Sequence, residues 1–91
     1  VTRTGKQAEI RRLINPFTSN ISFDLIVTKD APATFTVMDN FGRIVRKVTS
    51  KVFKGYNHVI LDQLNGLSNG MYFLRVETNN EILNKSVIKT N

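Results

Sequence analysis

Few side chains in this sequence could carry out catalysis, and their spacing is not that of an active site. His58 is the single histidine among 91 residues, so a histidine dyad is excluded. It lies out of phase with Val59 and Leu61, which directs it towards solvent in a strand. The serines lack the strand, turn and helix setting of a Gly-X-Ser-X-Gly nucleophile. The absence of cysteine also excludes thiolate catalysis, disulfides and cysteine zinc sites.

The acidic residues and the glycines form no recognisable site for a metal or a cofactor. None of the seven acids has the alternating carboxylate spacing of a calcium loop. No sequence feature brings together the paired carboxylates of a glycosidase. The five glycines form no phosphate-binding loop. We therefore expect a protein that is not an enzyme and has no catalytic residue, no metal and no cofactor.

A set of short landmarks in a fixed order is more informative than any candidate catalytic residue. In chain order they are Asn15-Pro16-Phe17, Asp39-Asn40-Phe41-Gly42-Arg43, Gly55-Tyr56-Asn57, Gly70-Met71-Tyr72, Lys85 and Lys89. Each one alone is ordinary turn and strand chemistry, since Asp and Asn bind turn backbone and Gly accepts a positive φ. Together, they suggest a module that is recognised by another molecule.

The elements that position these landmarks read as strands throughout. We expect strands at residues 8–14, 20–28, 33–39, 43–50, 56–61, 71–77 and 82–89, with turns at 29–32, 39–42 and 78–81. Turn residues recur about every 8–12 positions, which is typical of a β-sandwich. The predicted fold is therefore all-β, a single immunoglobulin-like antiparallel β-sandwich of about seven strands.

The alternation of apolar residues predicts which face of each strand is buried. Residues 21, 23, 25 and 27, then 33, 35 and 37, and then 72, 74 and 76 are expected to face inward, with 71, 73 and 75 outward. Two strands stay undecided. Residues 44, 46 and 48 compete with 45, 47 and 49, and residues 82, 84, 86 and 88 compete with 83, 85, 87 and 89. We expect the last strand to be an edge strand whose lysines discourage wrong pairing.

Size and composition limit the partners. A hydrophobic content of 41% fits one globular domain, and no apolar run approaches the roughly 20 residues of a membrane span. The net charge of +6 comes from scattered basic residues. Arg46 and Lys47, in the densest stretch, must point to opposite faces of a strand, and Phe53 is the only aromatic there. We expect neither nucleic-acid binding nor membrane insertion. No secretory signal is recognised, so we expect that of an exported parent to lie upstream.

At the landmarks the chain resembles the C-terminal sorting domain of the type IX (Por) secretion system of Bacteroidetes. The family's Pro-Asn-Pro-Phe-like element stands here as Ile14-Asn15-Pro16-Phe17, and its Asp-X-X-Gly-Arg turn as Asp39 to Arg43. Gly55 to Asn57, Leu67 to Leu74 and the lysine-containing segment from Lys85 to Lys89 follow in the family's order. The resemblance covers residues 13–91. Ile14 departs from the usual proline, and residues 1–12 are a linker, a cleavage region or an added first strand.

The resemblance implies a C-terminal secretion signal of a larger cargo protein. The cargo would enter the periplasm, and the type IX outer-membrane translocon would read the domain. A sortase-like peptidase would typically remove it, and the cargo would be attached to the cell surface or released. We expect the reader to engage an edge strand by β-augmentation, or the turn at Asp39 to Arg43 together with the last strand. An exposed edge strand also makes a dimer conceivable.

Two other functions remain open at this point. A carbohydrate- or protein-binding accessory sandwich of a secreted enzyme would need exposed aromatic residues on one sheet. Phe53, Tyr56 and Phe73 are the candidates, and we expect at least one of them to be buried. A purely structural spacer would bind nothing, and its deletion would not impair export.

Overall fold

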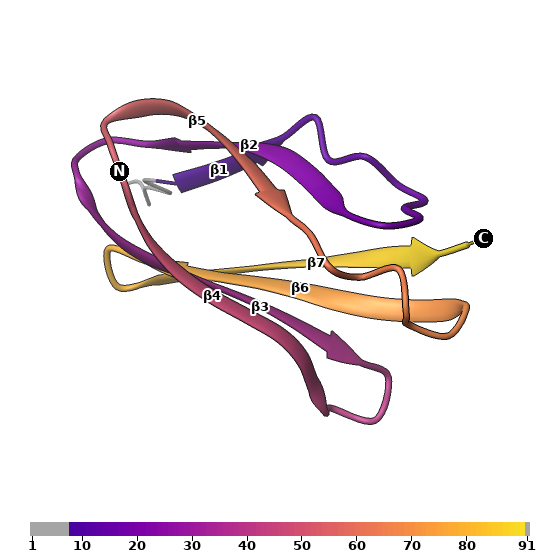
Figure 1. Ribbon diagram of the computed structural model, residues 1–91. Helices are drawn as coiled ribbons and strands as arrows, with labels where there is room; N and C mark the ends of the chain where they lie inside the picture. The colour runs from indigo at the N-terminus through magenta and orange to yellow at the C-terminus, as the bar shows by residue number, and fades with distance from the viewer. Residues whose placement is uncertain (1–7, 91) are drawn as a thin grey trace, which may run out of the picture.

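Residues 8–90, which the computed structural model describes, form two antiparallel β-sheets packed face to face (Figure 1). The strands are β1 (Ala8–Arg11), β2 (Ile21–Val27), β3 (Ala31–Asp39), β4 (Ile44–Val52), β5 (Gly55–Leu61), β6 (Gly70–Thr78) and β7 (Glu81–Lys89). One sheet has the order β1-β2-β5 and the other β4-β3-β6-β7. The expected immunoglobulin-like β-sandwich is confirmed. Among the same residues no helix is long and apolar enough to cross a bilayer.

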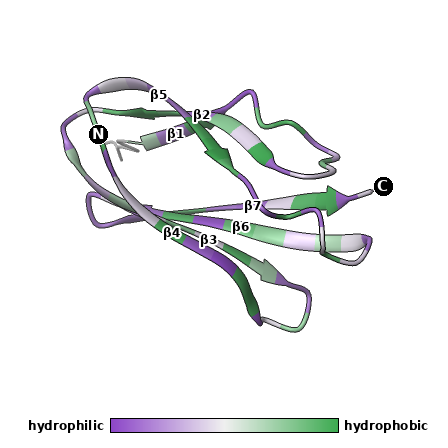
Figure 2. Cartoon of the chain, viewed as in Figure 1, coloured by the Kyte–Doolittle hydropathy of each residue, from purple (hydrophilic) through white to green (hydrophobic). Residues whose placement is uncertain are grey.

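The core lies between the sheets and follows the predicted alternation. Hydrophobic residues lie along the strands of both sheets (Figure 2), and the apolar residues at 21, 23, 25, 27, 72, 74 and 76 are buried as expected. The rings of Phe23 and Phe35 meet edge to face across the two sheets, with their centroids 5.9 Å apart. Each such buried side chain contributes roughly 1.5–3 kcal/mol through removal from water.

The undecided phase of β4 is resolved by a β-bulge. Val48 lies on the inner face and packs against the core. A register shift opposite Val37 and Met38 leaves Val45 as an extra residue, which also packs against the core, while Ile44 is exposed. Neither alternating phase therefore holds along the whole strand.

In β7, whose inward phase the sequence left undecided, Leu83 and Val87 face the core. β7 is an edge strand of its sheet, as expected. Lys85 shares the inner phase but remains exposed. Lys89 is buried, with 2% of its surface accessible, and its Nζ donates to the carbonyl oxygen of Thr90 at 3.3 Å. The expectation that both lysines guard an exposed edge is thus wrong for Lys89.

Two turn predictions have different outcomes. The hairpin at residues 78–81 is confirmed, since Asn79 and Asn80 both have positive φ values between β6 and β7. The turn predicted at residues 29–32 is shorter than expected, because β3 already begins at Ala31. Pro32 is tolerated there because the pairing of β3 with β6 starts only at Ala33, so no ladder bond to β6 is lost.

The N-terminal strand is also shorter than expected. β1 ends at Arg11 because Arg12 has a φ of 56°, in the left-handed region. β1 pairs with β2 and buries Ala8 in the core. Of the region expected to be a linker, a cleavage region or an added strand, residues 1–7 lie outside the described part of the chain.

Candidate recognition site

Most of the landmarks gather at one end of the sandwich. Asp39 and Tyr72 are cross-strand partners on β3 and β6, and Gly70 pairs with Lys89 on β6 and β7. The ring of Phe17 meets the ring of Tyr72 edge to face at 6.1 Å. Four segments that are separated in sequence thus meet near the C-terminal end of β7, on the right of Figure 1. We call this region the landmark end.

The turn between β3 and β4 is organised by the carboxylate of Asp39. Its Oδ1 accepts hydrogen bonds from the backbone N–H groups of Phe41 and Arg43, both at 2.9 Å. Its Oδ2 accepts from Arg43 Nε at 2.7 Å. Gly42 has a φ of 85°, which an L side chain rarely adopts, and its N–H donates to the carbonyl oxygen of Asp39. The Asp-X-X-Gly-Arg spacing is therefore that of a self-satisfied turn.

The same contacts make the turn sensitive to acid. Burial raises the pKa of Asp39, but hydrogen bonds from the backbone of Arg43 and Phe41, and the Arg43 side chain, outweigh burial and lower it overall. Because the pKa of Asp39 is lower in the folded state than in the unfolded state, its carboxylate stabilises the fold at pH values above the unfolded-state pKa. This stabilisation is lost as the pH falls through the folded-state pKa.

We therefore expect acid to lower the melting temperature of the wild type more than that of Asp39→Asn, which cannot be protonated. Thermal unfolding followed by circular dichroism between about pH 2 and pH 7 measures this difference. If both proteins lose stability equally over that range, Asp39 does not contribute to the acid sensitivity.

The first landmark covers the outer edge of β7 at its end. Phe17 N–H donates to the carbonyl oxygen of Ile88, and Thr90 N–H donates to the carbonyl oxygen of Phe17, both at 2.9 Å. Asn15 Oδ1 accepts from the N–H of Ile88 at 2.8 Å. Pro16 lies between them, after a cis peptide bond. This end of β7 is therefore already paired and is not free to accept another strand.

The landmark that opens β6 forms a tyrosine corner. Tyr72 is buried, and its hydroxyl donates to the carbonyl oxygen of Ser68 at 2.8 Å. Gly70 enters the strand with a φ of 147°, a conformation open mainly to glycine. Residues 66–70 spell Gly-X-Ser-X-Gly, but they lead into β6 rather than into a helix. Ser68 thus has a place in the corner rather than that of a nucleophile.

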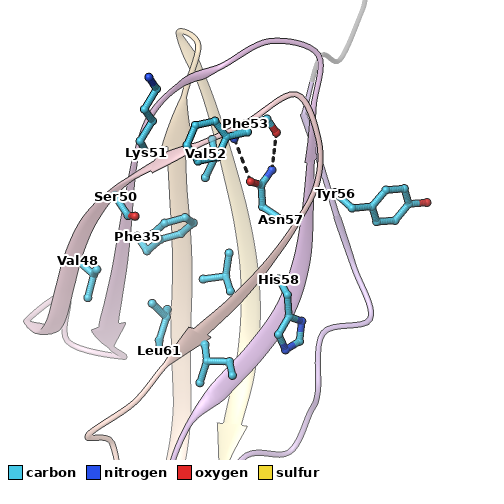
Figure 3. Close-up of a pocket in the computed structure, with 12 residues that line it drawn as sticks. Phe35, Val48, Ser50, Lys51, Val52, Phe53, Tyr56, Asn57, His58 and Leu61 are labelled. Carbon is cyan, nitrogen blue, oxygen red and sulfur yellow. Dashed lines mark hydrogen bonds between the residues drawn. The ribbon is translucent and has the colours of Figure 1, made fainter.

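Gly55 and Asn57 lie at the end of the sandwich opposite to the landmark end. There a cleft of about 500 Å³ opens between the edges of β4 and β5 (Figure 3). Asn57 Oδ1 accepts from the N–H of Phe53 at 2.9 Å, and Asn57 Nδ2 donates to the carbonyl oxygen of Phe53 at 2.8 Å. Asn57 therefore ties the β4–β5 connection and lies apart from the landmark end.

His58 and Lys85 both lie away from the landmark end. His58 faces solvent as expected, and its Nδ1 lies 2.9 Å from Asp24 Oδ1. Figure 3 shows it pointing away from the cleft. Lys85 lies in the middle of β7, beside Glu9 and Ile10 of β1, and not at the landmark end. Within residues 8–90 no group of three His, Cys, Asp or Glu is placed to hold a metal.

The expectation that one of three aromatic residues is buried is wrong, because Phe53, Tyr56 and Phe73 are all exposed. Tyr56 and Phe73 follow the outward phase of their strands, which belong to different sheets. Phe53 lies in the connection between β4 and β5. The three rings therefore share no sheet face and form no common platform for a sugar.

Sequence reasoning had not identified an apolar area on the outer face of the four-stranded sheet. Met38, Met71, Phe73 and Ile88 point outward there, and Ile44 joins them through the bulge in β4. Met71 and Phe73 had been assigned outward from alternation alone. Their assembly with β4 and β7 depends on strand order, for which the sequence holds no local signal.

Comparison with known proteins agrees with the geometry. The family model described as secretion system C-terminal sorting domain matches residues 15–90. Among seven matching chains of solved structures is that of dimeric latent PorU from Porphyromonas gingivalis. It is 20% identical, the TM-score is 0.69, and the match covers 90% of this chain and 9% of that chain. This likeness shows the fold alone. No curated protein matches significantly.

The family match covers all the landmarks from Asn15 to Lys89, and the fold gathers most of them at one end of the sandwich. The chain belongs to the family of secretion system C-terminal sorting domains.

Proposed function

We propose that the type IX outer-membrane translocon reads this domain at the landmark end and thereby exports a larger cargo protein. The observation that carries the proposal is the assembly of Asp39, Tyr72, Phe17 and Lys89 from four separate segments. Such an arrangement exists only in the folded domain. The export signal is then a folded surface rather than a linear peptide.

The contacts of β7 favour one of the two reading modes. β-augmentation needs unpaired backbone groups along an edge strand. At Ile88 and Thr90 these groups already bond to Asn15 and Phe17. The turn from Asp39 to Arg43 protrudes beside this covered end, and it lines a hollow of about 240 Å³ together with Gly70 and Tyr72. We therefore assign the reading to the turn and the end of β7 together.

The proposal extends to the steps before and after export. The cargo passes through the periplasm, a sortase-like peptidase removes the domain, and the cargo is attached to the cell surface or released. Because β1 pairs with β2 and contributes Ala8 to the core, the cut lies N-terminal to Ala8. β1 then belongs to the sorting domain, which begins before residue 13.

A fusion experiment tests this function. The 91-residue chain is attached to a periplasmic fluorescent protein in a Bacteroidetes host, with and without a working type IX translocon. We expect fluorescence outside the cell only when the translocon is present. Retention of a folded fusion protein in the periplasm of both strains would contradict the proposal. Mass spectrometry of the released reporter then locates the cut relative to Ala8.

A further inference from the structure

The outer face of the four-stranded sheet carries a continuous apolar surface beside the landmark end. Ile44, Met38 and Phe73 are direct cross-strand neighbours on β4, β3 and β6. Met71 and Ile88 form the next cross-strand pair, two residues along β6. We call these five residues the outer patch. Met38 is half-buried, the other four are exposed, and none belongs to the core between the sheets.

Single exposed apolar side chains are ordinary, but a contiguous group of large ones on a small domain marks an interaction surface. The outer patch contributes nothing to the core, because side chains of the opposite phase fill it. Met38, Phe73 and Arg75 also line a shallow hollow of about 460 Å³ on this face. A protruding side chain of a partner would fit there.

The charges around the outer patch indicate the partner's chemistry. The adjacent cross-strand row contains Lys47 and Arg75 on either side of Thr36, and Arg43 lies at the turn. Arg75 Nε is buried and has no hydrogen-bond acceptor among residues 8–90. The first acid on this face of β6, Glu77, is one row further from the patch. Arg75 as a whole is only half-buried, so a carboxylate from outside would reach the accessible part of its side chain and form a charge-assisted hydrogen bond there.

We infer that the outer patch docks a partner protein whose contact surface is apolar at its centre and carries carboxylates facing Arg75 and Lys47. The inference rests on the proposed function and deepens it, because this partner is the reader of the export signal. A second copy of the chain fits less well. Two copies packed patch to patch about an axis parallel to the strands would bring their Arg75 and Lys47 side chains towards one another, and like charges oppose such an interface.

The apolar half of the inference is tested with two matched double variants of the fusion protein. Ile44→Ser with Phe73→Ser removes the centre of the outer patch. Ile60→Ser with Phe53→Ser removes the same residue types elsewhere: Ile60 is as accessible as Ile44 (56% and 57%), and Phe53 is more accessible than Phe73 (55% and 38%). We expect the first variant to lower external fluorescence roughly tenfold and the second to leave it unchanged. Melting temperatures of both purified chains show that they are folded.

The charged half is tested by Arg75→Glu against Lys54→Glu, which lies in the β4–β5 connection. We expect only Arg75→Glu to reduce export, because it repels the partner's carboxylates. Failure of the wild type to be exported overturns the proposed function itself. Normal export of the folded patch variants, with the wild type exported, overturns this inference alone. If sedimentation shows a wild-type dimer that the patch variant abolishes, the occupant is a second copy and the acidic partner is wrong.

Discussion

Phe17→Ala is expected to lower the free energy of unfolding by about 3–5 kcal/mol, the usual cost of removing a buried phenylalanine. Only 2% of Phe17 is accessible, and its ring packs edge to face on Tyr72. Its backbone also holds the segment from Asn15 to Phe17 against the end of β7. The substitution leaves a cavity where the two sheets meet this segment. Urea unfolding of the 91-residue chain measures the loss.

Phe53→Ala is the matched control for this loss. Phe53 is 55% accessible and lies at the other end of the sandwich, where Lys51 Nζ lies 5.5 Å from the centre of its ring. We expect a change of about 1 kcal/mol or less, the magnitude of an exposed cation–π contact. Equal losses for the two variants would mean that the packing of Phe17 on Tyr72 does not support the fold.

Asp39→Ala is expected to reduce export by about tenfold or more while the domain remains folded. The substitution removes the acceptor for the backbone of Phe41 and Arg43 and for the Arg43 side chain. The turn then loses its single conformation, although the sandwich keeps its core. External fluorescence of the fusion protein measures export, and circular dichroism at the same temperature verifies folding.

Asp30→Ala provides the control for a lost turn carboxylate. Asp30 Oδ1 accepts from the N–H of Lys54 at 2.8 Å, at the end of the sandwich opposite to Asp39. If the translocon reads the landmark end, only Asp39→Ala impairs export. A comparable defect in Asp30→Ala would mean that export responds to general stability, and reading at the Asp39 turn would then be refuted.

The neighbouring segments explain why two lysines of one strand differ in burial. Lys85 and Lys89 share the inner phase of β7. Lys85 lies beside β1, where the rim of the sandwich leaves its side chain in water. Lys89 is covered because the parallel bridge to Phe17 places another segment beside it. Burial here depends on a contact between residues 72 positions apart, which no alternation rule contains.

Local rules were sufficient for most of the strands, turns and inward faces. β2 and β6 alternate in sequence with the period of a strand, so their buried residues could be assigned before any partner strand was known. The turn from Asp39 to Gly42 and the hairpin at Asn79 and Asn80 carry the residues that such backbones need. The landmarks were equally visible, because each is a short run of neighbours.

Only the tertiary structure decided the arrangement that these pieces form. The bulge in β4, the burial of Lys89 and the covering of β7 by Phe17 each depend on the register between strands distant in sequence. The outer patch likewise exists because strand order places Ile44, Met38 and Phe73 in one row. The sequence determines a strand's two faces through its period of two, whereas its neighbours are determined by the lowest free energy of the whole sandwich.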